Sequence, residues 1–270
     1  MGDLDGKVAI VTGAGRLRGI GRATAVHLAK MGANVVVTGT GRSPDRYPDD
    51  EKAVGWRDIE STAEQVREQG RQALSLVVDA MNRGQVQMMV DRTIETFGRV
   101  DVLINNAAFA RGADRVPIVE LDADIFQKVI DIKVTGTYLC TKAVLPHMIK
   151  QGEGGKIVNI SSSAGKRGSA NTLAYNAANF AVVGMTQSMA RELGTYKINV
   201  NCVCPGAVDT YRMDVLGRGE RWQQMGATTP IGRNGTDDET GGLIAYLCSD
   251  AASWIHGQSI NINGGTFMEH

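Results

Sequence analysis

The stretch "TGAGRLRGIG" at residues 12–21 decides how the rest of the chain is interpreted. It overlaps the end of the apolar run "KVAIVTG" (7–13) and leads into a segment with helical periodicity. Gly13, Gly19 and Gly21 allow a tight turn and the close approach of a pyrophosphate, which the free N–H groups of a helix N-terminus favour. Ordinary turns are also rich in glycine, but between a strand and a helix this pattern indicates a dinucleotide-binding βαβ unit.

Short β-rich runs alternate with amphipathic segments along the whole chain. The β-rich runs lie at 7–13, 34–39, 73–79, 100–107, 155–162, 197–206 and 259–265, and the helical segments at 21–31, 58–69, 83–97, 122–150, 175–193 and 237–248. This alternation indicates parallel βαβ units, and the nearly continuous apolar strands indicate a sheet buried on both faces. The sequence therefore predicts one α/β domain over residues 1–270, a Rossmann-type doubly wound parallel sheet of about seven strands flanked by helices.

Two long segments interrupt the alternation, and loops of this length are commonly functional. Residues 40–57 form a polar loop after the second strand, and residues 207–232 follow a later strand at the edge where open α/β sheets bind ligands. Met213, Leu216 and Trp222 of the second segment could form an apolar substrate lid or could equally be helix core residues.

Charge and composition limit the classes of partner that we expect. The formal net charge is zero and the pI is about 6.9, so we expect no nucleic-acid or membrane partner. No apolar run reaches the roughly 18 residues of a membrane span, and the N-terminus leads directly into a strand, which predicts a cytoplasmic protein. Cys202 and Cys204 would share one face of a strand with no histidine or carboxylate close by in sequence, so no metal site is expected.

Several short motifs occur in a fixed order that resembles the short-chain dehydrogenase/reductase family over nearly the whole chain. They are "TGAGRLRGIG" (12–21), with two extra residues before Gly19, "NNAA" (105–108), "NISS" (159–162), Tyr175, "PGAVDT" (205–210) and "GQSININGG" (257–265). The resemblance implies an oxidoreductase that interconverts a secondary alcohol and a ketone, as carbonyl reductases do, with a nicotinamide cofactor. It also implies a homo-oligomer, a tetramer or a dimer, assembled through helices 122–150 and 175–193.

The resemblance also assigns residues to the cofactor. Asp79 would hold the adenine amino group, although a strand-end cap is the alternative role, and Asn105 would lie beneath the nucleotide. The full set of expected cofactor contacts is Gly13, Arg16, Arg18, Gly19, Ile20, Gly21, Arg42, Asp79, Ala80, Asn105, Ala107, Tyr175, Asn179, Pro205, Gly206, Val208 and Thr210.

The choice between NAD and NADP depends on the end of the second strand. An acidic residue there would accept hydrogen bonds from the adenosine ribose and repel a 2′-phosphate. Gly39 stands at that place, and Arg16, Arg18 and Arg42 lie nearby in sequence. Arginine suits a 2′-phosphate, so the sequence favours NADP over NAD, although these arginines could instead be solvated loop charges.

The proton-transfer group presents an unusual pattern. A tyrosine hydroxyl can exchange a proton with the reacting oxygen, but its ordinary pKa is about 10. Lowering this pKa to near 7 requires the phenolate to be stabilised by roughly 4 kcal/mol. A cation about 5 Å away at an effective dielectric near 20 contributes about 3 kcal/mol. The resemblance places a lysine four residues after Tyr175, where this chain has Asn179. It places an asparagine in the preceding long helix, where this chain has Lys133.

We therefore hypothesise that Lys133 and Asn179 have exchanged places, so that Lys133 supplies the cation and Asn179 contacts the ribose or a relay water. The alternatives are two independent losses, which would leave a catalytically silent cofactor-binding protein, or Lys133 as a surface residue. A third class keeps the fold but performs lyase or dehydratase chemistry with Tyr175.

The substrate pocket is predicted beside the serine that resembles the family's carbonyl-binding residue. In "SSS" (161–163), the spacing to Tyr175 selects Ser162 to hydrogen-bond the substrate carbonyl, while Ser161 and Ser163 are expected to form strand-end hydrogen bonds. Arg111 would border the pocket, where it could meet an acidic group of the substrate, but it is interpreted as a solvent-facing loop residue.

Overall fold

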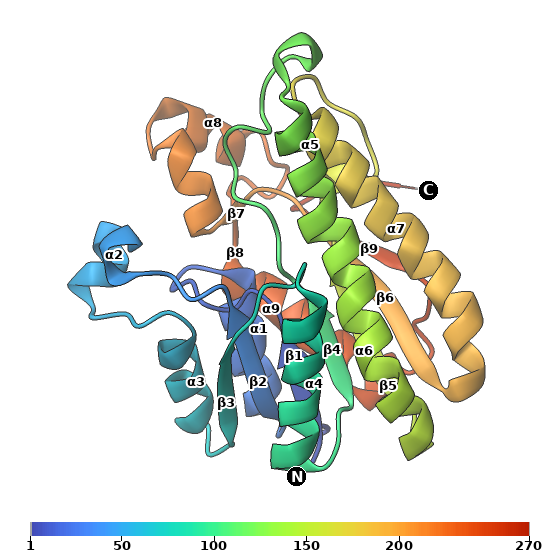
Figure 1. Ribbon diagram of the computed structural model, residues 1–270. Helices are drawn as coiled ribbons and strands as arrows, with labels where there is room; N and C mark the ends of the chain where they lie inside the picture. The colour runs from blue at the N-terminus through green and yellow to red at the C-terminus, as the bar shows by residue number, and fades with distance from the viewer. Residues whose placement is uncertain (1, 270) are drawn as a thin grey trace.

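A seven-stranded parallel sheet forms the centre of the molecule, as Figure 1 shows for the computed structural model, which describes residues 2–269. The strands run in the order β3-β2-β1-β4-β5-β6-β9. They are β1 (Val8–Val11), β2 (Asn34–Gly39), β3 (Ala73–Val77), β4 (Val102–Asn105), β5 (Gly155–Ile160), β6 (Ile198–Pro205) and β9 (Ser259–Ile262). The predicted doubly wound parallel sheet is confirmed, and a separate parallel pair, β7 (Val208–Asp209) and β8 (Gly235–Thr236), lies outside it.

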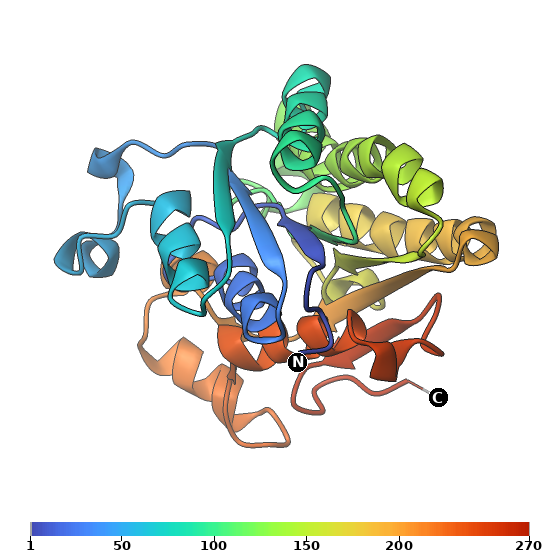
Figure 2. The same ribbon diagram turned by 90° about the horizontal axis from the view of Figure 1, so that it is seen from below.

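Helices cover both faces of the sheet (Figure 2). One layer comprises α1 (Ile20–Lys30), α3 (Ile59–Arg67) and α9 (Asp237–Leu247); the other comprises α4 (Arg83–Phe97), α5 (Ala123–Ile130), α6 (Gly136–Gln151) and α7 (Leu173–Leu193). The two short helices are α2 (Asp49–Ala53) and α8 (Glu220–Ala227). Single 3-10 turns lie at Pro44–Arg46, Ile118–Glu120, Ser163–Gly165, Gly194–Tyr196, Tyr211–Leu216 and Asp250–Ala252.

Three predicted segments differ from the structure. The helix expected over 122–150 is divided into α5 and α6 by a π-helical turn at Asp131–Thr135. The segment 40–57 contains α2, and the segment 207–232 contains α8. Short helices of mixed polarity lack the long apolar stripe by which a helix is recognised in sequence.

The core consists of two apolar layers separated by the sheet. Along β1, Ile10 packs on the side of α4 and α6, whereas Ala9 and Val11 pack on the side of α1 and α9. All three side chains are fully buried, as expected for a parallel strand covered on both faces. This packing fixes the strand ends from which the functional residues project.

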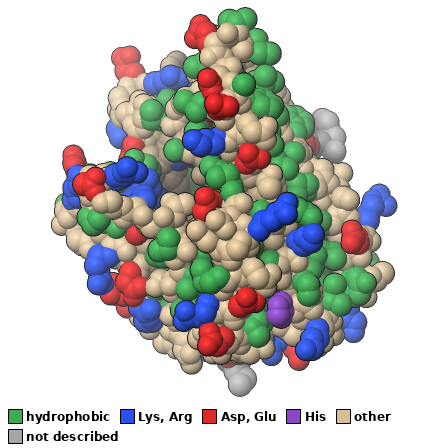
Figure 3. Space-filling view, viewed as in Figure 1, with side chains coloured by type: hydrophobic (Ala, Val, Ile, Leu, Met, Phe, Trp, Pro, Cys, Tyr) green, Lys and Arg blue, Asp and Glu red, His purple; other side chains and the backbone are tan. Residues whose placement is uncertain are grey.

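The chain reverses its direction of winding between β1 and β4, which are adjacent in the sheet. In open α/β folds, ligands bind beyond the carboxyl ends of the strands at such a point. Charged side chains of both signs are interspersed over the face shown in Figure 3. Among residues 2–269, no helix combines the length and apolarity needed to cross a membrane, and no group of three or more metal-ligating side chains gathers.

Candidate active site

One cavity of about 800 Å³ extends beyond the carboxyl ends of the central strands, from the glycine-rich loop to Tyr175. Five parts of the chain that are distant in sequence meet there: the loop after β1, the loop after β4, the helical stretch from α5 to α7, the end of β5 with the serines that follow it, and the segment after β6. The predicted residues that line it are Gly13, Arg16, Arg18, Gly19, Ile20, Gly21, Lys133, Ser162, Tyr175, Asn179, Pro205, Gly206, Val208 and Thr210. The fold therefore brings both halves of the predicted site into one space.

The glycine-rich loop has the backbone that an anion-binding turn requires. Gly13 has a φ of +67°, and a Cβ on Gly21 would lie 2.6 Å from Asn106 Nδ2, so neither position accepts a larger residue without a shift. Gly19 is the N-cap of α1 and provides no side-chain cap for the first-turn N–H groups. Its own N–H donates to Asp237 Oδ2 at 3.0 Å. A phosphate group fits this uncapped helix N-terminus.

The arginines near this loop are engaged by carboxylates. Arg18 bonds Asp50 at 2.7 Å, Asp209 at 3.1 Å and Asp214 at 2.5 Å, and the hydrogen bond to Asp214 raises its pKa. Arg16 lies 3.7 Å from Glu51 Oε2.

Arg42, which the sequence predicts to contact a 2′-phosphate, lies outside the cavity lining. Its three guanidinium nitrogens donate to Glu51, Asp58 and the carbonyl of Gly15. Glu51 is 1% exposed and Asp58 is 6% exposed, so both carboxylates are buried with their partner. The sequence does not reveal these contacts, because they form only when the irregular segment 40–58 folds back on itself and onto the glycine-rich loop.

Asp58 lies near Gly39 at the end of β2, where the sequence has no acidic residue, but like Arg42 it is outside the cavity lining. A Cβ built on Gly39 would lie 4.0 Å from Asp58 Oδ1, and one built on Gly15 would lie 1.7 Å from the same oxygen. A carboxylate therefore stands between the glycine-rich loop and the end of β2, although it comes from the start of α3 rather than from the strand.

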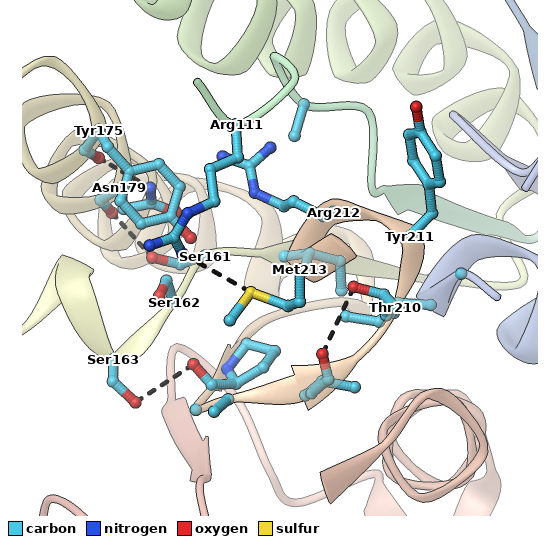
Figure 4. Close-up of a pocket in the computed structure, with 18 of the residues that line it drawn as sticks. Arg111, Ser161, Ser162, Ser163, Tyr175, Asn179, Thr210, Tyr211, Arg212 and Met213 are labelled. Carbon is cyan, nitrogen blue, oxygen red and sulfur yellow. Dashed lines mark hydrogen bonds between the residues drawn. The ribbon is translucent and has the colours of Figure 1, made fainter. Parts of the chain in front are cut away.

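The three consecutive serines differ in their hydrogen bonds (Figure 4). Ser161 donates to the carbonyl of Asn179 at 3.0 Å, and Ser163 donates to that of Pro205 at 3.2 Å. The Ser162 hydroxyl instead accepts the N–H of Ala164 at 3.2 Å, so its own proton is available to a ligand. This pattern supports Ser162 as the residue in register with Tyr175.

Tyr175 and Asn179 lie one turn apart near the N-terminal end of α7. The Asn179 amide donates to the carbonyl of Tyr175 at 2.7 Å and the residue is 1% exposed. Its Oδ1 is buried and has no hydrogen-bond partner within residues 2–269. Asn179 lines the cavity, and because an unpaired buried acceptor costs free energy, its Oδ1 suits a hydroxyl or ammonium donor.

Lys133 is in the middle of the π-helical turn between α5 and α6, and turns of this kind are frequent at functional sites. It is 5% exposed and lines the same cavity as Tyr175 and Asn179, so the surface-lysine alternative is excluded. Burial, and next the charge of Arg212, lower the pKa of Lys133 to about 8. No carboxylate is among the groups that act on its pKa.

Sequence reasoning missed two arginines and misplaced a third. Arg115 and Arg212 lie over the ring of Tyr175, with guanidinium carbons 3.8 Å and 5.1 Å from the ring centroid. Arg111, expected to face solvent, is half-buried and lines the cavity. Cation–aromatic contacts between remote loops leave no periodic signal in a sequence.

Four other predicted cofactor residues, Asp79, Ala80, Asn105 and Ala107, also lie outside the lining of the main cavity. Asp79 Oδ1 accepts the N–H of Met81 at 3.0 Å, which is the strand-end cap considered as its alternative role. Asn105 donates to Thr141 and to Asn159, so it cross-links β4 to α6 and β5. Its buried Oδ1 has no partner within the described residues.

The segment 207–232 closes one side of the cavity. Met213 is 8% exposed and lines the cavity, in contact with Arg111 Nη1 at 3.6 Å. Trp222 is buried in α8, outside the cavity lining, and stacks beneath Arg218. Of the two roles that the sequence left open, Met213 therefore fits that of a lid residue and Trp222 fits that of a helix core residue.

Comparison with known proteins gives matches over nearly the whole chain. A family model described as enoyl-(acyl carrier protein) reductase matches residues 13–266. The short chain dehydrogenase/reductase astE of Aspergillus oryzae is 38% identical, over 97% of this chain and 95% of its own. The structure of levodione reductase has a TM-score of 0.85 at 32% identity, over 97% of this chain and 98% of that one. The structure of carveol dehydrogenase from Mycobacterium avium in complex with NAD has a TM-score of 0.85 at 29% identity, over 98% of this chain and 99% of that one.

Proposed function

Because the chain belongs to the short-chain dehydrogenase/reductase family and is an oxidoreductase of that type, we propose that it interconverts a secondary alcohol and a ketone with Tyr175 as acid and base. The observation that carries the proposal is the single cavity that joins the glycine-rich loop to Ser162, Tyr175, Asn179 and Lys133. The proposed dinucleotide site and the proposed proton-transfer site would thus share one space.

The glycine-rich loop fits the pyrophosphate of a nicotinamide dinucleotide, because Gly13 and Gly21 admit close approach and α1 begins without a side-chain cap. The bound cofactor would supply or accept the hydride. Ser162 would donate a hydrogen bond to the substrate oxygen, and Tyr175 would give that oxygen a proton in reduction and remove it in oxidation.

Lys133 would supply the positive charge that Asn179 lacks. It enters the cavity from the helix that packs against α7, with its ammonium shielded from bulk water, where a charge acts more strongly than at a surface. Asn179 Oδ1 would accept from a cofactor ribose hydroxyl or from the Lys133 ammonium. The exchange of the two residue types would then preserve both roles on two helical segments that pack against each other.

The preference between nicotinamide cofactors is proposed to be for NAD, against the sequence prediction of NADP. Arg16 and Arg42 are balanced by the buried carboxylates Glu51 and Asp58, so the region beside Gly39 has no excess positive charge for a 2′-phosphate. Carveol dehydrogenase, a structural neighbour, is in complex with NAD. Comparing kcat/KM for NADH and NADPH with one ketone decides the preference.

The activity is tested by following the absorbance band of reduced nicotinamide with a panel of ketones and alcohols. We expect oxidation of the reduced cofactor with at least one ketone, and loss of it in Tyr175→Phe. Tight cofactor binding without turnover across the panel would instead favour a catalytically silent binding protein. Substrate conversion without cofactor oxidation would favour a lyase or dehydratase.

A further inference from the structure

Three arginines converge on the wall of the cavity beside Tyr175, and we call Arg111, Arg115 and Arg212 the arginine cluster. The first two come from the segment between β4 and α5, and the third from the 3-10 turn Tyr211–Leu216. All three line the cavity, and Figure 4 shows Arg111 and Arg212 beside Tyr175. The proton-transfer residue is therefore surrounded by more positive charge than Lys133 alone provides.

The contacts of the cluster hold its members against the tyrosine. Arg115 lies 3.8 Å from the ring centroid of Tyr175, and Arg212 lies 5.1 Å from it on a side chain anchored to the carbonyl of Phe109. The segment between β4 and α5 and the turn Tyr211–Leu216 thus each present a guanidinium next to Tyr175, the group proposed to exchange a proton with the substrate oxygen.

The cluster carries more positive than negative charge. Among the described residues, its one ion pair joins Arg115 Nε to Asp114 Oδ2 at 3.1 Å. Burial, followed by repulsion from Arg115 and Arg212, lowers the pKa of Arg111. Arg16 and Arg18 line the same cavity but are paired with carboxylates, whereas Arg167, which also lines it, is exposed to solvent and donates to the carbonyl of Thr266. The arginine cluster therefore holds three guanidiniums, all partly shielded from solvent, against a single carboxylate.

Buried like charges cost free energy unless an opposite charge compensates them. Guanidinium groups match a carboxylate through parallel hydrogen bonds, and they bind it more strongly away from water. An anion placed here would lie close to the reacting oxygen because two of the guanidiniums contact the ring of Tyr175.

We propose that the arginine cluster binds a carboxylate of the substrate, so that the enzyme acts on a short oxo acid and the corresponding hydroxy acid. The inference rests on the proposed function and deepens it by assigning the substrate class. The same guanidiniums could in principle meet the phosphates of the cofactor, and the experiment separates these two sources of negative charge.

The first arm compares levulinate, a 4-oxo acid, with its neutral methyl ester under saturating reduced cofactor. We expect the ratio of their kcat/KM values to favour the acid by about 100-fold, the usual order for a buried charged contact. Arg111→Met should reduce this ratio about 30-fold, and Arg111→Lys should restore part of it. Arg92→Met, an exposed arginine paired with Glu95 on α4, serves as the matched control. Equal turnover of acid and ester in the unmodified enzyme would overturn the proposal.

The second arm measures binding without turnover, by calorimetric titration of levulinate into the enzyme saturated with oxidised cofactor. Binding that weakens in Arg111→Met and at higher salt supports the carboxylate site even if no ketone is reduced, in which case only the proposed reaction fails. If Arg111→Met and Arg115→Lys weaken cofactor binding and leave levulinate binding intact, the cluster serves the cofactor phosphates and the proposal is wrong. Absence of levulinate binding to the folded, cofactor-loaded enzyme also contradicts it.

Discussion

Ser162 differs from Ser161 and Ser163 in one respect, since its hydroxyl proton is not committed to the neighbouring backbone. We expect Ser162→Ala to reduce kcat about 100-fold, because the alkoxide that develops during transfer loses a hydrogen-bond donor. Steady-state kinetics check this, with Ser163→Ala as the control. A larger loss of kcat in Ser163→Ala than in Ser162→Ala would place the substrate oxygen elsewhere.

Lys133 is expected to reduce the stability of the fold. Its folded pKa of about 8 lies below the ordinary lysine value of 10.5, so the unfolded chain binds its proton more tightly. The resulting decrease in the free energy of unfolding is fully present below pH 8 and disappears as the pH rises through 10.5. Lys133→Met should therefore raise the free energy of unfolding at pH 7 by about 3 kcal/mol, with the difference narrowing between pH 8 and 10.5.

Urea denaturation of both proteins at pH 7, 8 and 10 measures this difference. A variant that is less stable than the parent at pH 7 would show that the ammonium has a compensating partner. A stabilising substitution that also removes activity would indicate that the buried charge is retained for function, as is common in active sites.

At the scale of elements, Arg18 joins the two long segments that flank the cavity. It bonds Asp50 in α2 on one side and Asp209 and Asp214 beyond β6 on the other. These partners are part-exposed, so each pair contributes a modest amount. Arg18→Ala should raise the dissociation rate of bound cofactor about tenfold, because both segments open more readily over the groove.

Stopped-flow displacement of the reduced cofactor checks the rate. Asp50→Asn is the informative companion, since it breaks the link while leaving the arginine in place, and it should also accelerate release. An effect confined to Arg18→Ala would mean that Arg18 contacts the cofactor directly, as the sequence predicted.

Sequence patterns could predict those elements whose residues repeat with a period. The seven strands and most of the long helices follow from apolar runs and amphipathic spacing. The choice of Ser162 among the three serines follows from the family resemblance, through its spacing to Tyr175. The pairing of Arg42 with Glu51 and Asp58, and the approach of Arg115 and Arg212 to Tyr175, depend on how irregular segments fold back. Such contacts have no period and become visible only in three dimensions.

At the scale of the whole molecule, α6 and α7 present apolar side chains to solvent. Tyr138, Leu173 and Phe180 are 47%, 43% and 45% exposed, on the helices through which the sequence predicts assembly. We propose that the enzyme is a dimer or a tetramer that covers them. Sedimentation should show this assembly, and Phe180→Lys should shift it toward the monomer because a charge would be buried at the contact. A monomer at micromolar concentration contradicts the proposal.

The proposed mechanism as a whole depends on the charge that Lys133 brings to the proton-transfer site, and a double-mutant cycle of kcat/KM tests it most directly. Lys133→Asn should reduce kcat/KM about 100-fold, in line with a loss of about 3 kcal/mol. Combining it with Asn179→Lys should return kcat/KM to within about tenfold of the parent. A double variant that shows the product of two independent losses, or a single variant with full activity, would contradict the account.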